Sequence, residues 1–174
     1  MTATTTRHTA TVLLSALMLL AAAPQSAYAQ APPDLGQMLV SGLKATPGCL
    51  GVETAQTSSG KQVIFAWFEN KQAVLRWYHS DVHQRVIRMF MPGERPAHTP
   101  LSHIADDGMP VLAVASLTMA GAAQIEGVGL PFSQIAIELY RPAPGGIAIG
   151  GRFAPAALTV PGLIDVPLAP SDKR

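Results

Sequence analysis

Within one run of seven residues, four side chains could do chemistry together: Trp77, Tyr78, His79 and His83. His79 and His83 are four positions apart, so on an unbroken helix both imidazoles lie on one face. Histidine titrates near neutral pH and can act as a general base. Aromatic walls with a few polar groups are typical of small-molecule sites. We therefore predict His79 and His83 as catalytic residues and Trp67, Trp77 and Tyr78 as substrate-binding residues.

Two less specific interpretations compete with this one. Clustered aromatic side chains are more often core than binding site, and two histidines can be exposed polar residues at a sheet edge. The i, i+4 spacing of His79 and His83 can also hold a metal ion through neutral imidazole nitrogens. A third ligand would have to come from a later loop, where the candidates are His98, His103, Asp106 and Asp107. The histidine pair alone is a weak signal, so we predict no metal site.

Composition narrows the class of protein. The chain has 174 residues, of which 13% are charged and 48% hydrophobic, which suits one folded domain and excludes a disordered solvating chain. No basic run is present, so nucleic acid is not an expected partner. The single cysteine, Cys49, excludes an internal disulfide and is expected to be a buried small apolar side chain.

The N-terminus has the pattern of a secretory signal peptide. Arg7 precedes the apolar run Val12–Ala23, and Ala27-Tyr28-Ala29 has small residues where signal peptidase cleaves. We predict a signal peptide over 1–29, a mature chain beginning at Gln30, and a periplasmic or secreted protein with no stable membrane span after cleavage. An uncleaved anchor is the alternative.

Hydrophobic periodicity places the elements. Apolar residues recur at helical spacing from Leu35 to Leu43, with Asp34 as a possible cap. Cys49–Thr57 and Gln62–Glu69 are separated by a short connector and predict a hairpin. The second strand is apolar on both faces, which predicts that both faces are covered.

A helix is expected after Asn70, which suits an N-cap, and a break is expected at Ser80-Asp81, because both residues prefer caps to helix interiors. Val111–Met119 and Ser133–Arg141 read as strands, and Ile147–Phe153 as a further one. In the Ser133–Arg141 strand, alternation predicts Ile135, Ile137 and Leu139 on the inward face. We predict a single α+β domain over 30–154 and a Pro-rich C-terminal tail over 155–174.

At two places the residues resemble a known family. Pro47-Gly48-Cys49-Leu50-Gly51-Val52-Glu53 is similar to the helix-to-strand junction of antibiotic-biosynthesis-monooxygenase-like domains, and Val63–Ser80 is similar to their next strand-helix unit. The resemblance implies a ferredoxin-like antiparallel sheet with helices on one face, paired as a dimeric α+β barrel, and hence a homodimer. Such domains begin with a strand, which is missing here. We expect a permuted arrangement in which Ser133–Arg141 supplies it from the C-terminal side.

The haem-degrading branch of this family gives the sharpest comparison. Trp77 matches the tryptophan that contacts the porphyrin in that branch, but Ile87 stands at the position of its iron ligand. His83 lies one helical turn earlier. We therefore expect no cofactor, with haem as the alternative.

The sequence leaves two function hypotheses. The first is an exported monooxygenase-like protein that binds a small aromatic or polycyclic molecule and oxidises it without a cofactor. The second is a non-catalytic envelope binding or structural module that keeps the fold and lacks an active site.

Overall fold

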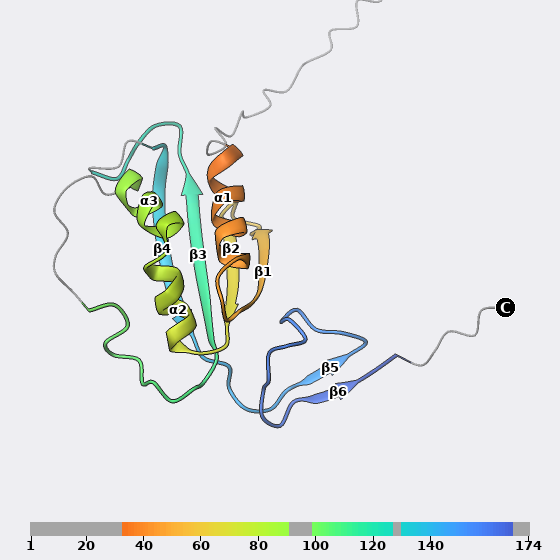
Figure 1. Cartoon of the computed structure of the whole chain (residues 1–174). Coiled ribbons are helices and arrows are strands. Elements are labelled where there is room, and N and C mark those ends of the chain that lie inside the picture. Colours follow the sequence, from red (N-terminus) through yellow and green to blue (C-terminus); the bar gives the residue numbers. More distant parts are fainter. Residues whose placement is uncertain (1–32, 91–98, 127–129, 169–174) are drawn as a thin grey trace, which may run out of the picture.

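The computed structural model describes residues 33–90, 99–126 and 130–168. The predicted signal peptide and His98 lie outside these residues. Among the described residues, no helix has both the length and the apolarity needed to cross a bilayer. The elements in chain order are α1 (Pro33–Lys44), β1 (Cys49–Gln56), β2 (Gln62–Phe68), α2 (Lys71–Tyr78), α3 (Asp81–Phe90), β3 (Val111–Met119), β4 (Phe132–Tyr140), β5 (Ile147–Ile149) and β6 (Ile164–Val166) (Figure 1).

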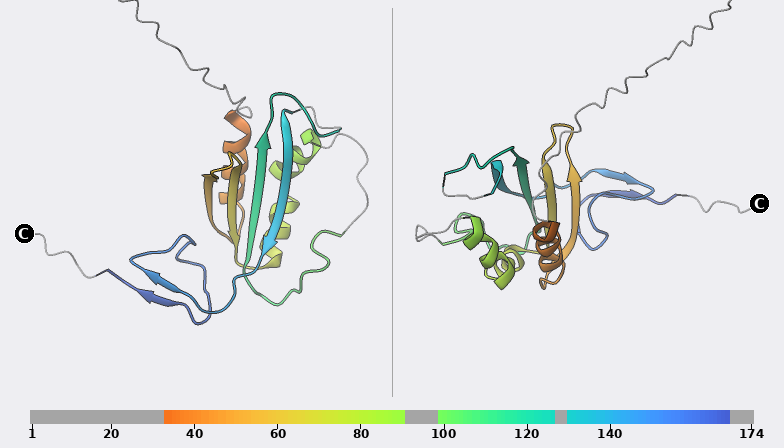
Figure 2. Two further views of the ribbon diagram at one scale, coloured as in Figure 1. Left: turned by 180° about the vertical axis from the view of Figure 1, so that it is seen from behind. Right: turned by 90° about the horizontal axis from the view of Figure 1, so that it is seen from above.

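Strands β1 to β4 form one antiparallel sheet in the order β1-β2-β3-β4. All three helices lie on one face of it, as Figures 1 and 2 show. The predicted α+β, ferredoxin-like class is confirmed. The predicted C-terminal strand is present as β4, at the edge of the sheet, and it is the fourth strand. Strand β3, which follows the helices in the chain, lies inside the sheet between β2 and β4.

Alternation along β2 separates the two faces of the sheet. Phe68 and Ala66 point toward the helices and are almost fully buried, whereas Phe65 and Trp67 point to the other face. This is the alternation that the sequence predicts for an extended strand. The core under the helices comprises Leu43, Val52, Ala66, Phe68, Ala73, Val74, Trp77 and Val111.

A tight junction joins α1 to β1. Gly48 has a positive φ of 83°, and a Cβ built on it would lie 2.5 Å from the Glu69 Oε1 atom. Only glycine adopts this conformation at low cost and leaves room for the neighbouring carboxylate. The Gly48 carbonyl also accepts a hydrogen bond from the Glu69 N–H, which ties the junction to the end of β2.

The predicted helix break occurs between α2 and α3, and both predicted caps are present. The Asn70 side chain accepts a hydrogen bond from the Ala73 N–H at 3.0 Å. The Ser80 hydroxyl accepts one from the His83 N–H at 3.2 Å. Each cap satisfies a backbone donor in a first helical turn, where no carbonyl of the same helix is available. At α1 the prediction was less accurate, because the helix begins at Pro33 and so includes Asp34.

The face of the sheet away from the helices is partly covered by residues 153–161, which we call the strap. Phe153 packs edge-on against Trp67 with ring centroids 5.0 Å apart, and Leu158 is buried. Part of the predicted tail over 155–174 is therefore packed against the domain, and it also includes β6, which pairs in parallel with β5. The predicted strand Ile147–Phe153 is shorter than expected and ends at Ile149.

The inward face of β4 departs from its prediction. Leu139 packs against the core, but Ile137 on the same side of the strand is 64% exposed. The main helix–strand contacts are those of α1 with β1 and of α2 with β2, so the edge strand β4 follows the predicted alternation without being buried along its whole length.

Candidate functional site

The orientation of His83 is set by the carbonyl that ends α2. Its Nδ1 atom lies 2.9 Å from the Tyr78 carbonyl oxygen. A carbonyl can only accept, so Nδ1 carries the proton and, in the neutral imidazole, the lone pair is on Nε2. The Gln84 amide donates to the same oxygen at 2.5 Å. This geometry holds one defined tautomer of the kind that a general base requires.

Aromatic rings flank His83. The Trp77 and Tyr78 rings each have their centroids 5.2 Å from the imidazole centroid. We call Trp77, Tyr78, His79 and His83 the aromatic–histidine cluster. Trp77 is only 9% exposed and belongs to the core, so it forms the base of the cluster. Tyr78 and His83 are half-buried and His79 is exposed.

The helix break changes how the two histidines relate. His79 is the C-cap of α2, and His83 lies in the first turn of α3. They therefore do not share the face of one continuous helix, on which the i, i+4 argument depended. Both rings contact Tyr78, His79 at 5.1 Å, so the tyrosine joins them in one cluster.

Trp67 lies apart from the rest of the predicted site. Its ring packs with Phe65 and Phe153 on the face of the sheet away from the helices, whereas Trp77 lies on the buried face of α2. The sheet separates them. The structure therefore brings together four of the five predicted residues and places Trp67 in different surroundings.

The acidic loop residues proposed as further metal ligands lie at the wrong end of α2. Asp106 accepts a hydrogen bond from Gln72 in the first turn of that helix, and Asp107 pairs with Arg141. His79 is at the other end, two helical turns away. Over the described ranges, no three His, Cys, Asp or Glu side chains gather as a metal site requires.

The residues around the cluster do not fit a haem group. Trp77 has little free surface to offer a porphyrin, because it packs in the core and its ring lies 3.1 Å from where a Cβ on Gly42 would be. Ile87, at the position of the iron ligand in the haem-degrading branch, has no donor atom for iron. We therefore derive no chemistry through haem.

Two cavities stand out among the described residues, and neither is lined by the cluster. The smaller, of about 100 Å³, lies between Trp67, Leu112, Tyr140 and Leu158. The larger is a groove of about 400 Å³ at the end of the sheet, between the strap and the turn Gly108–Pro110. Sequence reasoning missed both, because the strap that forms one wall of each has no periodicity.

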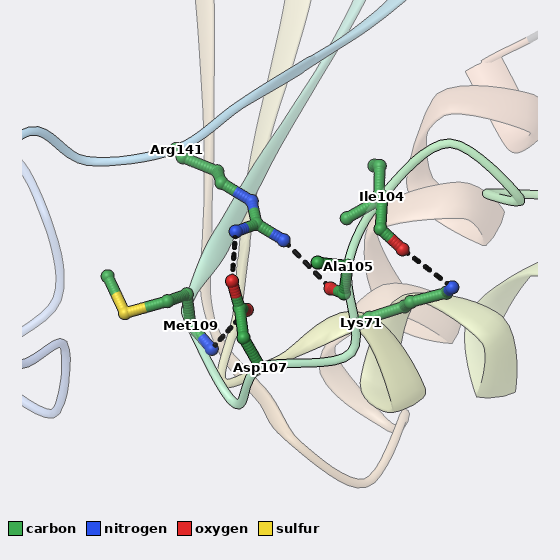
Figure 3. A network of polar contacts seen from close by, with 6 residues as sticks. All are labelled: Lys71, Ile104, Ala105, Asp107, Met109 and Arg141. Carbon is green, nitrogen blue, oxygen red and sulfur yellow. Dashed lines mark hydrogen bonds and ion pairs between the residues drawn. The ribbon is translucent and has the colours of Figure 1, made fainter.

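A polar network that the sequence did not reveal fixes this end of the sheet (Figure 3). Arg141, just after β4, donates to the Asp107 carboxylate at 2.6 Å and to the Ala105 carbonyl at 2.9 Å. The Arg141 hydrogen bond, together with one from the Met109 N–H, holds the pKa of Asp107 below its ordinary value. Lys71 donates to the Ile104 carbonyl at 2.7 Å, so the same loop is also attached to α2.

Comparison with known proteins gives one match, which covers an N-terminal part of the chain. Residues 23–89 match the family model described as antibiotic biosynthesis monooxygenase. Neither the comparison with curated proteins nor that with solved structures returned a match. The matched segment includes α1, the β1–β2 hairpin, α2 and nearly all of α3. Over these residues the chain is similar to antibiotic biosynthesis monooxygenase domains.

Proposed function

We propose that the protein is an exported, monooxygenase-like protein that binds a small aromatic or polycyclic molecule at the aromatic–histidine cluster. The observation that carries this proposal is the fixed His83 tautomer between the Trp77 and Tyr78 rings. A flat ligand can stack on the half-buried Tyr78 ring, and the oriented imidazole beside it can remove a proton from the ligand.

His83 is the base in the oxidative form of this proposal. Its Nε2 takes a proton from an acidic carbon of the substrate, and the carbanion passes electrons to dioxygen. For a methylene group, two hydrogens leave, one oxygen atom becomes a carbonyl oxygen and the other leaves as water. The substrate is the reductant, so the reaction uses neither metal nor flavin.

The non-catalytic alternative is favoured by a separate observation. Trp77 is a core residue, and the two described cavities lie away from His83. A protein of this kind keeps the fold and binds without enclosing its ligand. Oxidation requires exclusion of water from the reacting carbon, which binding alone does not.

One experiment separates the two functions. Anthrone, with its acidic methylene, is titrated into the mature protein, and binding and oxygen uptake are both measured. In His83→Asn the side-chain amide can still donate to the Tyr78 carbonyl, but it has no basic nitrogen. We expect this variant to bind anthrone and to lose oxygen uptake by about 10²-fold or more. His103→Asn, the same change at an exposed histidine outside the cluster, is the matched control and keeps both.

Binding without oxygen uptake by the unmodified protein supports the non-catalytic module. No saturable binding of anthrone or related polycyclic phenols refutes the ligand site. Export is checked on the protein expressed with its leader: mass spectrometry of the mature chain should give Gln30 as the first residue.

We also propose a homodimer. The β5–β6 ribbon has one face made entirely of exposed aliphatic side chains: Ile147, Ile149, Ile164 and Val166. A two-stranded ribbon is marginal in water, and an apolar face of this kind is typical of an interface. Light scattering should give a dimer mass, and Ile147→Ser/Ile164→Ser should shift it toward the monomer. An unmodified protein that stays monomeric at high concentration rules this out.

A further inference from the structure

The groove at the end of the sheet is built from segments far apart in the sequence. It lies where β1 and β3 begin and β2 ends. One wall is the strap, and the other is the turn Gly108–Pro110. Its volume of about 400 Å³ falls within the range of small-molecule sites, about 300–1,000 Å³.

The strap wall is fixed to the sheet at several points. Phe153 packs against the Phe65 and Trp67 rings. Pro155 lies so close to Gly51 in β1 that a Cβ there would be 3.0 Å from its ring, so the missing side chain lets the strap approach. Leu158, only 5% exposed, is the third point.

The strap is also braced by Arg152, the residue that directly precedes it. The Arg152 guanidinium donates to the Ala156 carbonyl at 2.6 Å and to the Leu158 carbonyl at 2.8 Å. A chain segment held in this way keeps its shape without a ligand. The strap therefore offers a preformed wall, on which Ala157 and Thr159 line the groove.

The opposite wall is held by the network in Figure 3. The Asp107 carboxylate accepts from the Met109 N–H at 3.1 Å and from Arg141. These contacts fix the turn between the end of β4 and the start of β3. Both walls are therefore in place before a ligand arrives, which reduces the entropy lost on binding.

The lining of the groove indicates the class of ligand. Leu50, Met109, Pro110, Ala157 and Pro161 present apolar surface, and the polar groups are Glu69 and Thr159. The Glu69 carboxylate is paired with the Arg76 guanidinium at 3.0 Å. Its charge is therefore balanced within the protein, and the groove has no net charge to attract an ion. The carboxylate and hydroxyl oxygens can still accept hydrogen bonds.

We propose that this groove is a second binding site, separate from the aromatic–histidine cluster, for a small, neutral, largely apolar molecule that carries a hydroxyl or N–H group. The apolar lining buries the body of the ligand, and Glu69 or Thr159 accepts its hydrogen bond. The site belongs to the C-terminal part of the chain as much as to the monooxygenase-like domain, because the strap forms one wall.

N-phenyl-1-naphthylamine is a suitable probe, because it is neutral, apolar, carries one N–H and fluoresces when it leaves water. It is titrated into the full mature chain. Ala157→Phe places a ring in the groove, and Ala156→Phe places the same ring on the neighbouring exposed strap residue outside it. We expect saturable binding that Ala157→Phe weakens at least tenfold and Ala156→Phe leaves within twofold.

Thr159→Phe narrows the same groove from a second position and should reproduce the loss. His83→Asn should leave probe binding unchanged, so this test can fail or succeed independently of the function proposed for the cluster. Equal binding by the unmodified protein and Ala157→Phe overturns the proposal. So does a loss that appears in Ile147→Ser/Ile164→Ser instead, because the probe would then be on the β5–β6 ribbon.

Discussion

Trp67 and Trp77 lie on opposite faces of the four-stranded sheet. Trp67 packs against Phe153 of the strap, and Trp77 packs in the core under the helices. The two tryptophans therefore report on two different layers of the molecule, and each can be observed alone by replacing the other with phenylalanine.

This separation gives the first prediction. Phe153→Ala removes the ring that covers Trp67, so in a Trp77→Phe background the emission should move to longer wavelength as water reaches the indole. In a Trp67→Phe background the same substitution should leave the emission of Trp77 unchanged. Equal shifts in both backgrounds would show that the strap does not act locally on the open face.

The second prediction concerns the cap between α2 and α3. Ser80→Ala removes the acceptor for the His83 N–H and should lower the free energy of unfolding by about 0.5–2 kcal/mol. Ser80→Asp keeps an acceptor oxygen and should retain most of the stability. Urea denaturation of the two variants beside the unmodified protein measures both. Equal losses would mean that the hydroxyl acts through packing and not as a cap.

The third prediction is a pH dependence. The pKa of Asp107 is lowered in the folded state by the Arg141 hydrogen bond, so its contribution to stability is present above the ordinary value of 3.8 and is lost as the pH falls through the folded value. Asp107→Asn removes this titration. The difference in unfolding free energy between the two proteins should be constant near neutral pH and shrink in acid.

A urea series from neutral pH to below pH 3 measures this difference, with Asp165→Asn on the exposed strand β6 as the control. A difference that grows in acid would contradict the assigned direction.

The fourth prediction concerns Cys49. Burial raises the pKa of its thiol above the ordinary 9.0, so little thiolate is present at mildly alkaline pH. Its reaction with a disulfide reagent should be at least tenfold slower than that of a free thiol and should reach the free-thiol rate in concentrated urea. A fast reaction in the folded protein would show that the thiol is accessible and ionised.

Much of the fold could be predicted from the sequence because its signals are local. Alternation along β2 gave the two faces of the strand, and Asn70 and Ser80 marked the helix starts by chemistry that operates within three residues. The site was less predictable. A period of two tells that Trp67 and Phe68 point to opposite faces, but not which face the helices cover.

The groove was beyond local reasoning for a related reason. It depends on the strap reaching β1 at Gly51 and on Arg141 reaching Asp107, contacts between segments far apart in the chain. Neither proline recurrence nor a lone glycine indicates such a contact in advance. For Ile137, the side of the strand was predicted correctly, but its burial was not. Burial of a side chain on an edge strand depends on how far the helices extend over it.

The strand order has a consequence for how the chain folds. In the described sheet, β1 with β2 and β3 with β4 are hairpins of consecutive strands, and only the β2–β3 pairing joins residues on either side of the helices. Short-range pairings form quickly, whereas a pairing that closes a long loop is slow. We expect two hairpins that form early and a rate-limiting step in which Phe68 and Val111 come into register, so conservative substitutions at these two positions should slow folding more than they speed unfolding.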